Sequence, residues 1–186
     1  MKRVIALVLL FATLCGCSLS NSGLNKAMEL REGVLKAQSC SFQATITADY
    51  SEKIYTFVMQ CTFDSNADMK FEVRRPDTLS GISGNVSDQG GKLTFDDKAL
   101  LFEPLIDDMI SPVSAPWVFF RALRGGYIKG CATDDAGYYI QIDDSYEDNS
   151  LQLDVWADHN VIPLNVEMFW MGRRILSITI ENFTLL

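Results

Sequence analysis

LQLDVWADHNVIPLNVEMFWMGRRILSITIENF, residues 151–183, is the stretch that says most about how this chain folds. Apolar residues recur at every second position in each of its three segments, which is the pattern of strands with one buried face. The residues between the segments predict one tight turn and one three-residue loop. The alternating apolar positions are Leu151, Leu153, Val155 and Ala157, then Ile162, Leu164, Val166 and Met168, then Leu176, Ile178 and Ile180.

The two turns predict how these strands pair. A tight turn at residues 159–160 places Val155 opposite Leu164. A three-residue loop over residues 170–172, with its glycine in the left-handed conformation, then places Leu164 opposite Ile178. One apolar face therefore runs through all three strands, because a shift of one residue would turn every side chain to the other face.

The same two-residue period occurs earlier in the chain and predicts a larger antiparallel sheet. It is clearest in residues 42–50, 55–63 and 69–73. Further strand signals, separated by turn residues, cover residues 81–87, 92–95, 99–102, 127–133 and 138–143.

Two segments break this period and predict helices. Residues 24–38 carry apolar side chains at three- and four-residue steps. Within residues 104–124, Leu105, Ile106, Met109 and Ile110 have the spacing of one helical face, which Pro112 ends. Ser114 is then expected to cap a second helix that ends at the glycines 125–126.

The N-terminus has the features of a secretory signal. A positive start is followed by an apolar run over residues 4–14, which is shorter than the ~20 residues of a spanning helix. The ending Leu14-Cys15-Gly16-Cys17 resembles the bacterial lipobox, whose last cysteine carries acyl chains such as palmitate. We therefore expect residues 1–16 to be removed, and residues 17–23 to form an acylated tether in the cell envelope, outside the cytoplasm. A signal peptide cut at another position is the alternative.

The charge of the chain excludes one class of partner. The formal net charge is −8, and loss of Lys2 and Arg3 with the signal makes it two units more negative. Nucleic-acid binding needs clustered lysines and arginines for phosphate contacts, so we expect none. Anionic lipid head groups should also repel such a chain, so the acyl chains on Cys17 would hold it at the membrane.

Three cysteines, Cys40, Cys61 and Cys131, remain in the mature chain. Cys40 and Cys61 lie on the apolar faces of adjacent strands. One register of this hairpin places them opposite each other, and an oxidising compartment would then allow a disulfide. The alternative register, one two-residue step away, pairs Phe42 with Cys61 instead.

The sequence contains no pattern that predicts catalysis or a cofactor. No C-x-x-C spacing occurs and His159 is the sole histidine, so a zinc site is not expected. No G-x-S-x-G nucleophile elbow occurs. The acidic residues 143–149 lack the order of a calcium loop, so a solvated turn is the interpretation. We expect a non-enzymatic protein without catalytic residues, metal or cofactor.

Four stretches resemble the LolA/LolB lipoprotein-carrier superfamily, which includes LppX-like lipoproteins and RseB-like sensors. They are residues 42–46, residues 71–76 running into 79–82, residues 92–96, and residues 178–183. The resemblance covers residues 24–186, which we expect to form a single domain. It implies an α+β fold in which a strongly curved antiparallel β-sheet, an incomplete barrel, is covered on its concave face by helices.

The resemblance also implies a function, in which a hydrophobic cavity between sheet and helices holds a lipid or a lipoprotein acyl chain. The expected lining residues are Phe42, Ile46, Phe57, Met59, Phe71, Leu105, Met109, Trp117, Phe120, Leu153, Val155, Leu164 and Val166. The segment 105–123 would be a movable lid. The alternative is a non-enzymatic envelope interaction or sensor module, with a filled core and a protein partner.

Overall fold

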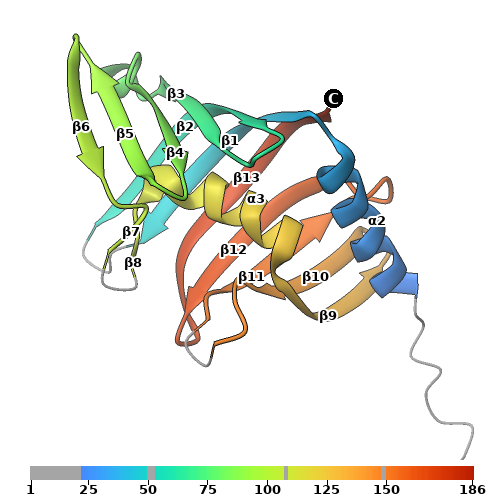
Figure 1. The fold of residues 1–186 in the computed structure, drawn as a ribbon. Coiled ribbons are helices and arrows are strands. Elements are labelled where there is room, and N and C mark those ends of the chain that lie inside the picture. The colour runs from blue at the N-terminus through green and yellow to red at the C-terminus, as the bar shows by residue number, and fades with distance from the viewer. Residues whose placement is uncertain (1–21, 50–52, 107–108, 148–149) are drawn as a thin grey trace, which may run out of the picture.

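The computed structural model describes residues 22–49, 53–106, 109–147 and 150–186, which contain two α-helices and one large sheet (Figure 1). The helices are α2 (Ser22–Lys36) and α3 (Ala115–Gly125). The strands of the large sheet are β1 (Ser39–Asp49), β2 (Ile54–Asp64), β3 (Met69–Arg75), β4 (Ser83–Ser87), β5 (Gly90–Phe95), β6 (Lys98–Phe102), β9 (Tyr127–Asp134), β10 (Gly137–Asp143), β11 (Gln152–Ala157), β12 (Pro163–Trp170) and β13 (Arg173–Leu185). Two short 3₁₀ turns, Asp77–Leu79 and Pro112–Ser114, lie between the strands.

The large sheet has 11 strands in the order β6-β5-β4-β3-β2-β1-β13-β12-β11-β10-β9. Each neighbouring pair is antiparallel, and β1, the first strand in the chain, pairs with β13, the last. The sheet is not closed, because β6 and β9 form its two edges. This open antiparallel architecture is consistent with the incomplete barrel expected from the sequence.

One face of the sheet is apolar and buried. In β1, every second residue from Cys40 to Ala48 is buried, while the polar residues between them are half-buried. The same alternation continues in β2 and β3. The two-residue period read from the sequence is therefore confirmed as one buried face that crosses the sheet.

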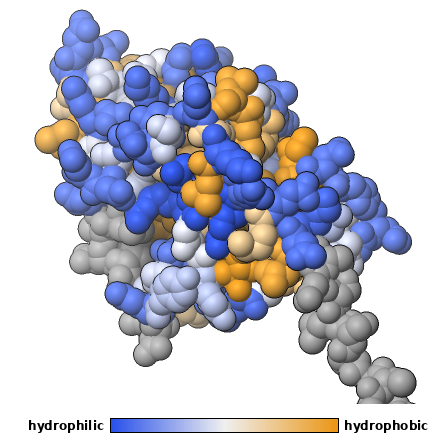
Figure 2. All heavy atoms as spheres, turned by 45° about the vertical axis from the view of Figure 1, so that its right-hand side comes forward, coloured by the Kyte–Doolittle hydropathy of each residue, from blue (hydrophilic) through white to orange (hydrophobic). Residues whose placement is uncertain are grey.

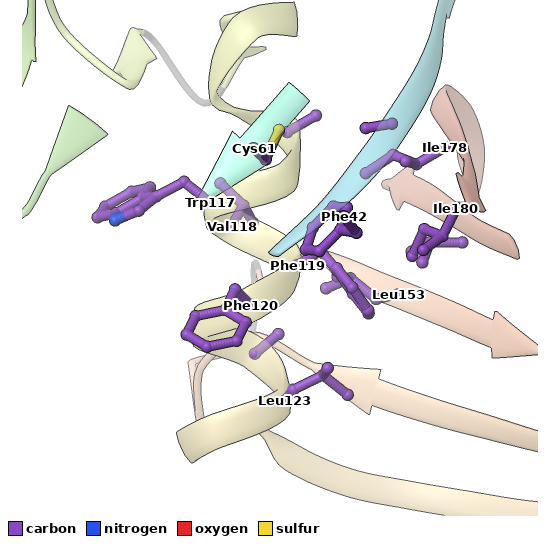
Figure 3. Packing of buried hydrophobic residues seen from close by; sticks show 14 of the residues in the cluster. Phe42, Cys61, Trp117, Val118, Phe119, Phe120, Leu123, Leu153, Ile178 and Ile180 are labelled. Carbon is purple, nitrogen blue, oxygen red and sulfur yellow. The ribbon is translucent and has the colours of Figure 1, made fainter. Parts of the chain in front are cut away.

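The two helices pack against this buried face. Phe119 and Phe120 point from α3 toward Phe42 of β1 and Phe63 of β2, and α3 runs across the sheet between its two edges (Figures 1 and 3). The buried side chains of α2 are Ala27, Leu30 and Val34, at the three- and four-residue steps seen in the sequence.

The β1–β2 hairpin adopts the alternative of the two registers that the sequence left open. Phe42 lies opposite Cys61, and Cys40 lies opposite Phe63. Both cysteines are free and buried. The candidate Cys40–Cys61 disulfide is therefore wrong for this structure, because the hairpin register offsets the two thiols by one diagonal step.

The predicted register of the last three strands is wrong by two residues. Val155 pairs with Val166 rather than with Leu164, and Val166 pairs with Ile178. Between β11 and β12 the cause is the loop, where the carboxylate of Asp158 accepts hydrogen bonds from the backbone N–H groups of residues 160 and 162 at 2.9 Å, and a bulge in β12 follows it. Between β12 and β13 the predicted three-residue loop is also wrong: Trp170 pairs with Arg173 across a two-residue turn, and a bulge between Met168 and Phe169 shifts the pairs that follow.

Two further predictions are corrected between β6 and α3. Residues 105–110 do not form a helical turn: β7 (Leu105–Ile106) and β8 (Met109–Ile110) pair as a short antiparallel hairpin. A run of apolar residues this short does not distinguish a helical turn from a pair of short strands. Ser114 does not cap α3 through its side chain, because it lies in the preceding 3₁₀ turn with its buried hydroxyl unpaired.

Candidate functional site

The site expected from the sequence lies between the apolar face of the sheet and α3. Ten of the expected lining residues are buried there in one hydrophobic cluster. They are Phe42, Ile46, Phe57, Met59, Phe71, Trp117, Phe120, Leu153, Val155 and Val166. The structure therefore brings residues from β1, β2, β3, β11, β12 and α3 into one buried cluster.

One expected lining residue is misplaced and others lie outside the described part. Leu164 is 40% exposed. It lies at the bulge in β12, between Pro163, which pairs with Ala157, and Asn165, which pairs with Trp156, so Leu164 itself has no partner in β11. Leu105 and Met109 belong to the β7–β8 hairpin, but their side chains lie outside the described part of the structure. Cys17, the expected acylation site, also lies outside the described residues.

Aromatic rings fill the space between α3 and the sheet. The ring of Phe120 stacks on Phe63 at 4.2 Å between centroids, and Phe119 meets Phe42 edge-on at 6.2 Å. Phe42 also stacks on Phe63 at 5.4 Å and on Phe183 at 5.7 Å. The interior is therefore filled by the protein's own rings, in geometries that such pairs favour.

Three of these rings were not among the expected lining residues. Phe63 continues the two-residue period of β2, so its pattern already indicated an inward side chain. Phe119 lies beside Phe120 in a short helix that is buried on most of its surface, so helical spacing could not show which of the two faces the sheet. Phe183 reaches Phe42 through the pairing of β13 with β1, which only the sheet topology decides.

Arg31 of α2 holds the C-terminal end of α3. Its guanidinium donates hydrogen bonds to the carbonyl oxygens of Leu123 at 2.8 Å, Gly126 at 2.6 Å and Ala122 at 3.4 Å. The last carbonyls of a helix lack a full set of helical partners, although the carbonyl of Ala122 also accepts the backbone N–H of Gly126, and the helix dipole favours a cation at this end. Arg31 therefore ties the C-terminal end of α3 to α2.

Two arginines of α3 make further polar contacts on its outer side. Arg121 lies 3.3 Å from the carboxylate of Asp88 in the β4–β5 turn and 4.6 Å from the ring centroid of Trp117. Arg124 donates to the carbonyl oxygen of Ser65 at 3.0 Å in the β2–β3 turn. Together with Arg31, these contacts tie both flanks of α3 to its neighbours, while its inner side is apolar.

A surface cavity of about 490 Å³ lies beside the outer side of α3. Charged side chains of both signs line it, including Arg121, Arg124, Asp88 and Asp144. Burial raises the pKa of Asp144, whose carboxylate accepts a hydrogen bond from the backbone N–H of Leu151 at 2.8 Å. This cavity is polar, so it lacks the character of an acyl-chain site.

A smaller groove of about 370 Å³ has the apolar character that the other cavity lacks. It lies between α2, the loop before β12 and the end of β13. Leu30, Val161, Phe183 and Leu185 supply most of its apolar lining, with Gly33 at its floor. Leu30 and Val161 belong to the buried cluster and Phe183 packs against it, so the groove reaches the hydrophobic interior from outside.

The environment of the three thiols predicts their reactivity. Burial raises the pKa of Cys40 to about 12, and burial and the neighbouring Cys40 also raise the pKa of Cys61. Cys131 in β9 is only half-buried, and burial raises its pKa as well.

Since the thiolate is the reactive form, iodoacetamide at neutral pH should modify Cys131 first and the other two cysteines only after unfolding. Peptide mass mapping of the protein before and after denaturation measures this order.

The same experiment tests the disulfide state. Denaturation without a reductant is expected to expose Cys40 and Cys61 as free thiols, in agreement with the observed hairpin register. A peptide in which the two cysteines are linked would contradict this prediction.

The described residues contain no grouping that could hold a metal ion with three or more histidine, cysteine, aspartate or glutamate side chains. His159 lies in the exposed loop before β12, and its Nε2 is 3.2 Å from the carbonyl oxygen of Asp135. In the part of the chain that the structure describes, no helix is long and apolar enough to cross a membrane.

Comparisons with known proteins give likenesses in structure only. Neither a protein-family model nor a curated protein sequence matches the chain. A LolA superfamily protein from Nitrosomonas europaea is similar, with 8% identity, a TM-score of 0.49 and coverage of 86% of this chain and 93% of that chain. The Mycobacterium tuberculosis lipoprotein LppX is similar at 12% identity and a TM-score of 0.42, covering 86% and 92%.

An uncharacterized conserved protein from Thermus thermophilus is also similar, with 12% identity, a TM-score of 0.48 and coverage of 86% of this chain and 87% of that chain. At these identities the likeness concerns the fold alone.

Proposed function

We propose that this protein is a non-enzymatic envelope lipoprotein, tethered to a membrane through acylated Cys17, that binds a lipid or lipoprotein acyl chain between the sheet and α3. In this proposal the sheet is the concave wall of an incomplete barrel and α3 is its lid. One observation carries the proposal: α3 is the layer that separates the aromatic face of β1 and β2 from solvent on this side. Displacement of α3 would expose a continuous apolar surface.

The contacts of α3 suit a lid that opens. Its inner side makes non-directional apolar contacts, which an acyl chain can replace at little cost because both are hydrocarbon. Its outer contacts are a few hydrogen bonds and one ion pair from Arg31, Arg121 and Arg124. Burial of an acyl chain gains about 0.8 kcal/mol per methylene, so about ten methylenes would offset the loss of several such contacts.

The apolar groove beside α2 supplies a route to this site. It joins the surface to the buried cluster at Leu30 and Phe183, and Phe183 stacks directly on Phe42. An acyl chain that enters there would meet the aromatic rings beneath α3 before any charged group of the lid.

Native mass spectrometry of the full protein with Cys17→Ser, purified from membranes, tests the proposal. A bound species with the mass of a lipid, and uptake of a fluorescent fatty acid, are expected. Phe120→Ala, which empties space beneath α3, should change the affinity for the fatty acid, whereas Leu101→Ala on the exposed strand β6 should not. A ligand-free protein that also takes up no fatty acid would exclude acyl-chain binding.

The contacts of Arg31 predict how fast the lid opens. Arg31→Met removes three hydrogen bonds to the end of α3 while it keeps the length of the side chain. Charged hydrogen bonds contribute about 1.5–3 kcal/mol, so fatty-acid uptake should accelerate by about tenfold or more. Stopped-flow fluorescence measures this rate.

Lys36→Met is the matched control for this prediction. Lys36 lies on the same helix, and its ion pair with Glu32 is exposed and adds little to stability. Equal uptake rates for the Arg31 and Lys36 variants would show that Arg31 does not hold a lid.

The edge strand β6 favours the second candidate function, an interaction or sensor module that binds a protein. Leu100 and Leu101 on this unpaired edge are 63% and 78% exposed. Exposed apolar edge strands pair readily with a strand from another chain. Leu101→Lys should abolish recovery of a partner from detergent-solubilised membranes if this function holds, and should leave fatty-acid uptake unchanged.

A further inference from the structure

The helix α2 carries a second apolar surface that its packing on the sheet does not use. Ala27, Leu30 and Val34 are buried, whereas Leu24, Met28 and Leu35 are 45%, 48% and 50% exposed. At 100° per residue, these three exposed side chains fall within about 40° of one another on one flank of the helix. They form a stripe about 16 Å long, at a rise of 1.5 Å per residue. Hydrophobic residues gather among polar ones on the side of the molecule that carries α2 (Figure 2).

Two tyrosines lie near the same flank. Arg31, which is on this flank of α2, donates to the carbonyl oxygen of Gly126, directly before Tyr127. The rings of Tyr127 and Tyr146 lie 5.4 Å apart, and both side chains are exposed. Tyrosine combines an apolar ring with a polar end, the combination found at the boundary between lipid and water.

The position of the tether indicates what covers this surface. Cys17 precedes the first residue of α2 by five residues, which span at most about 17 Å when fully extended. If acyl chains on Cys17 are in a bilayer, the N-terminal end of α2 must stay within that distance of the lipid. The exposed edge of β6 lies on the opposite side of the molecule from α2 (Figure 1).

We propose that the exposed stripe of Leu24, Met28 and Leu35 docks on the surface of a phospholipid bilayer, with Tyr127 and Tyr146 beside it. The inference rests on the tethering part of the proposed function and goes beyond it, because it orients the domain. An amphipathic helix that lies in the interface buries its apolar side among the acyl chains. The charges of α2 are mixed, with Lys26 paired to Glu29 and Lys36 paired to Glu32, so apolar contact rather than charge would hold it there.

Photo-crosslinking of the full, natively processed protein in phosphatidylcholine vesicles tests this docking. Benzoylphenylalanine at position 28 or 35 should crosslink to lipid with about tenfold higher yield than at position 54, since only the first two would lie among lipid chains. Ile54 is the matched control because it is 68% exposed and begins β2, at the end of the β1–β2 hairpin away from α2. Leu35→Glu should lower the lipid crosslink at position 28 several-fold, whereas Glu32→Gln should not.

Mass spectrometry of the N-terminal peptide from the same sample distinguishes failure of the docking from failure of the acyl tether on which the docking rests. Acylated protein with lipid crosslinks at positions 28 and 35 supports the docking. Acylated protein whose crosslinks equal those at position 54, or go to a second copy of the chain, overturns the docking and leaves the tether intact. An unmodified N-terminus downstream of residue 17 overturns both.

Discussion

Phe42→Ala is expected to lower the free energy of unfolding by about 3–5 kcal/mol, the usual cost of removing a buried phenylalanine ring. Phe42 is fully buried at the centre of the aromatic cluster, in contact with Phe63, Phe183 and Phe119. Loss of its ring would leave a cavity beneath α3 and remove contacts to two strands and the helix at once. Urea denaturation followed by circular dichroism measures the change.

Phe95→Ala is the matched control for Phe42→Ala. Phe95 is the last residue of β5 and is exposed, so its truncation should cost less than about 1 kcal/mol. The comparison separates the free energy that comes from contacts within the aromatic cluster from the general effect of removing a ring. Similar losses for both variants would show that the cluster does not hold the domain together.

The Phe42→Ala variant also bears on the function. A cavity lined by apolar side chains is a site for an apolar ligand, as engineered cavities in protein cores show. If acyl chains bind beneath α3, a fatty acid should recover part of the lost stability, because a ligand that binds only the folded state stabilises it. The melting temperature with and without fatty acid measures this recovery.

Gly137→Ala is expected to destabilise the protein by about 2–5 kcal/mol, the sum of backbone strain and overpacking. Gly137 begins β10 with φ of +143°, a conformation that residues with a side chain rarely adopt. An ideal Cβ at this position would lie 2.1 Å from the carbonyl oxygen of Ala157 on the paired strand β11. The alanine can be accommodated only if the β9–β10 turn or the β10–β11 pairing shifts.

Gly130→Ala supplies a close control in the neighbouring strand β9. An added Cβ at Gly130 would meet no atom within 4 Å, and its φ is not in the left-handed region. Its substitution should be neutral or slightly stabilising, because alanine restricts the unfolded chain more than glycine does. Thermal unfolding of the two variants should therefore differ clearly, and equal melting temperatures would contradict the structural basis given for Gly137.

The spacing of apolar residues along the chain was enough to predict most of the strands and both helices. The alternation in residues 42–50 and 55–63 reappears as β1 and β2, and the three- and four-residue steps of residues 24–38 reappear as α2. The glycines at 125–126 end α3 as expected. These features depend on near neighbours in the chain, so a local pattern carries the information.

Strand register could not be predicted in the same way. The side chain of Asp158 widens the loop before β12, and the bulge that follows places Leu164 at the surface. The two registers of the β1–β2 hairpin differ by one two-residue step, which leaves the same side chains on the apolar face. Only the packing of those side chains against other elements distinguishes them.

The sequence by itself determined that this chain forms an antiparallel sheet with one apolar face, and which side chains belong to that face, because both follow from a two-residue period. The tertiary structure alone decided that Phe119 and Phe120 meet Phe42 and Phe63, and that Arg31 holds the end of α3. Those contacts join residues far apart in the chain, so no local pattern encodes them. Whether an interior is filled depends on the volumes of all its side chains together, and that sum exists only once the sheet and α3 have been placed against each other.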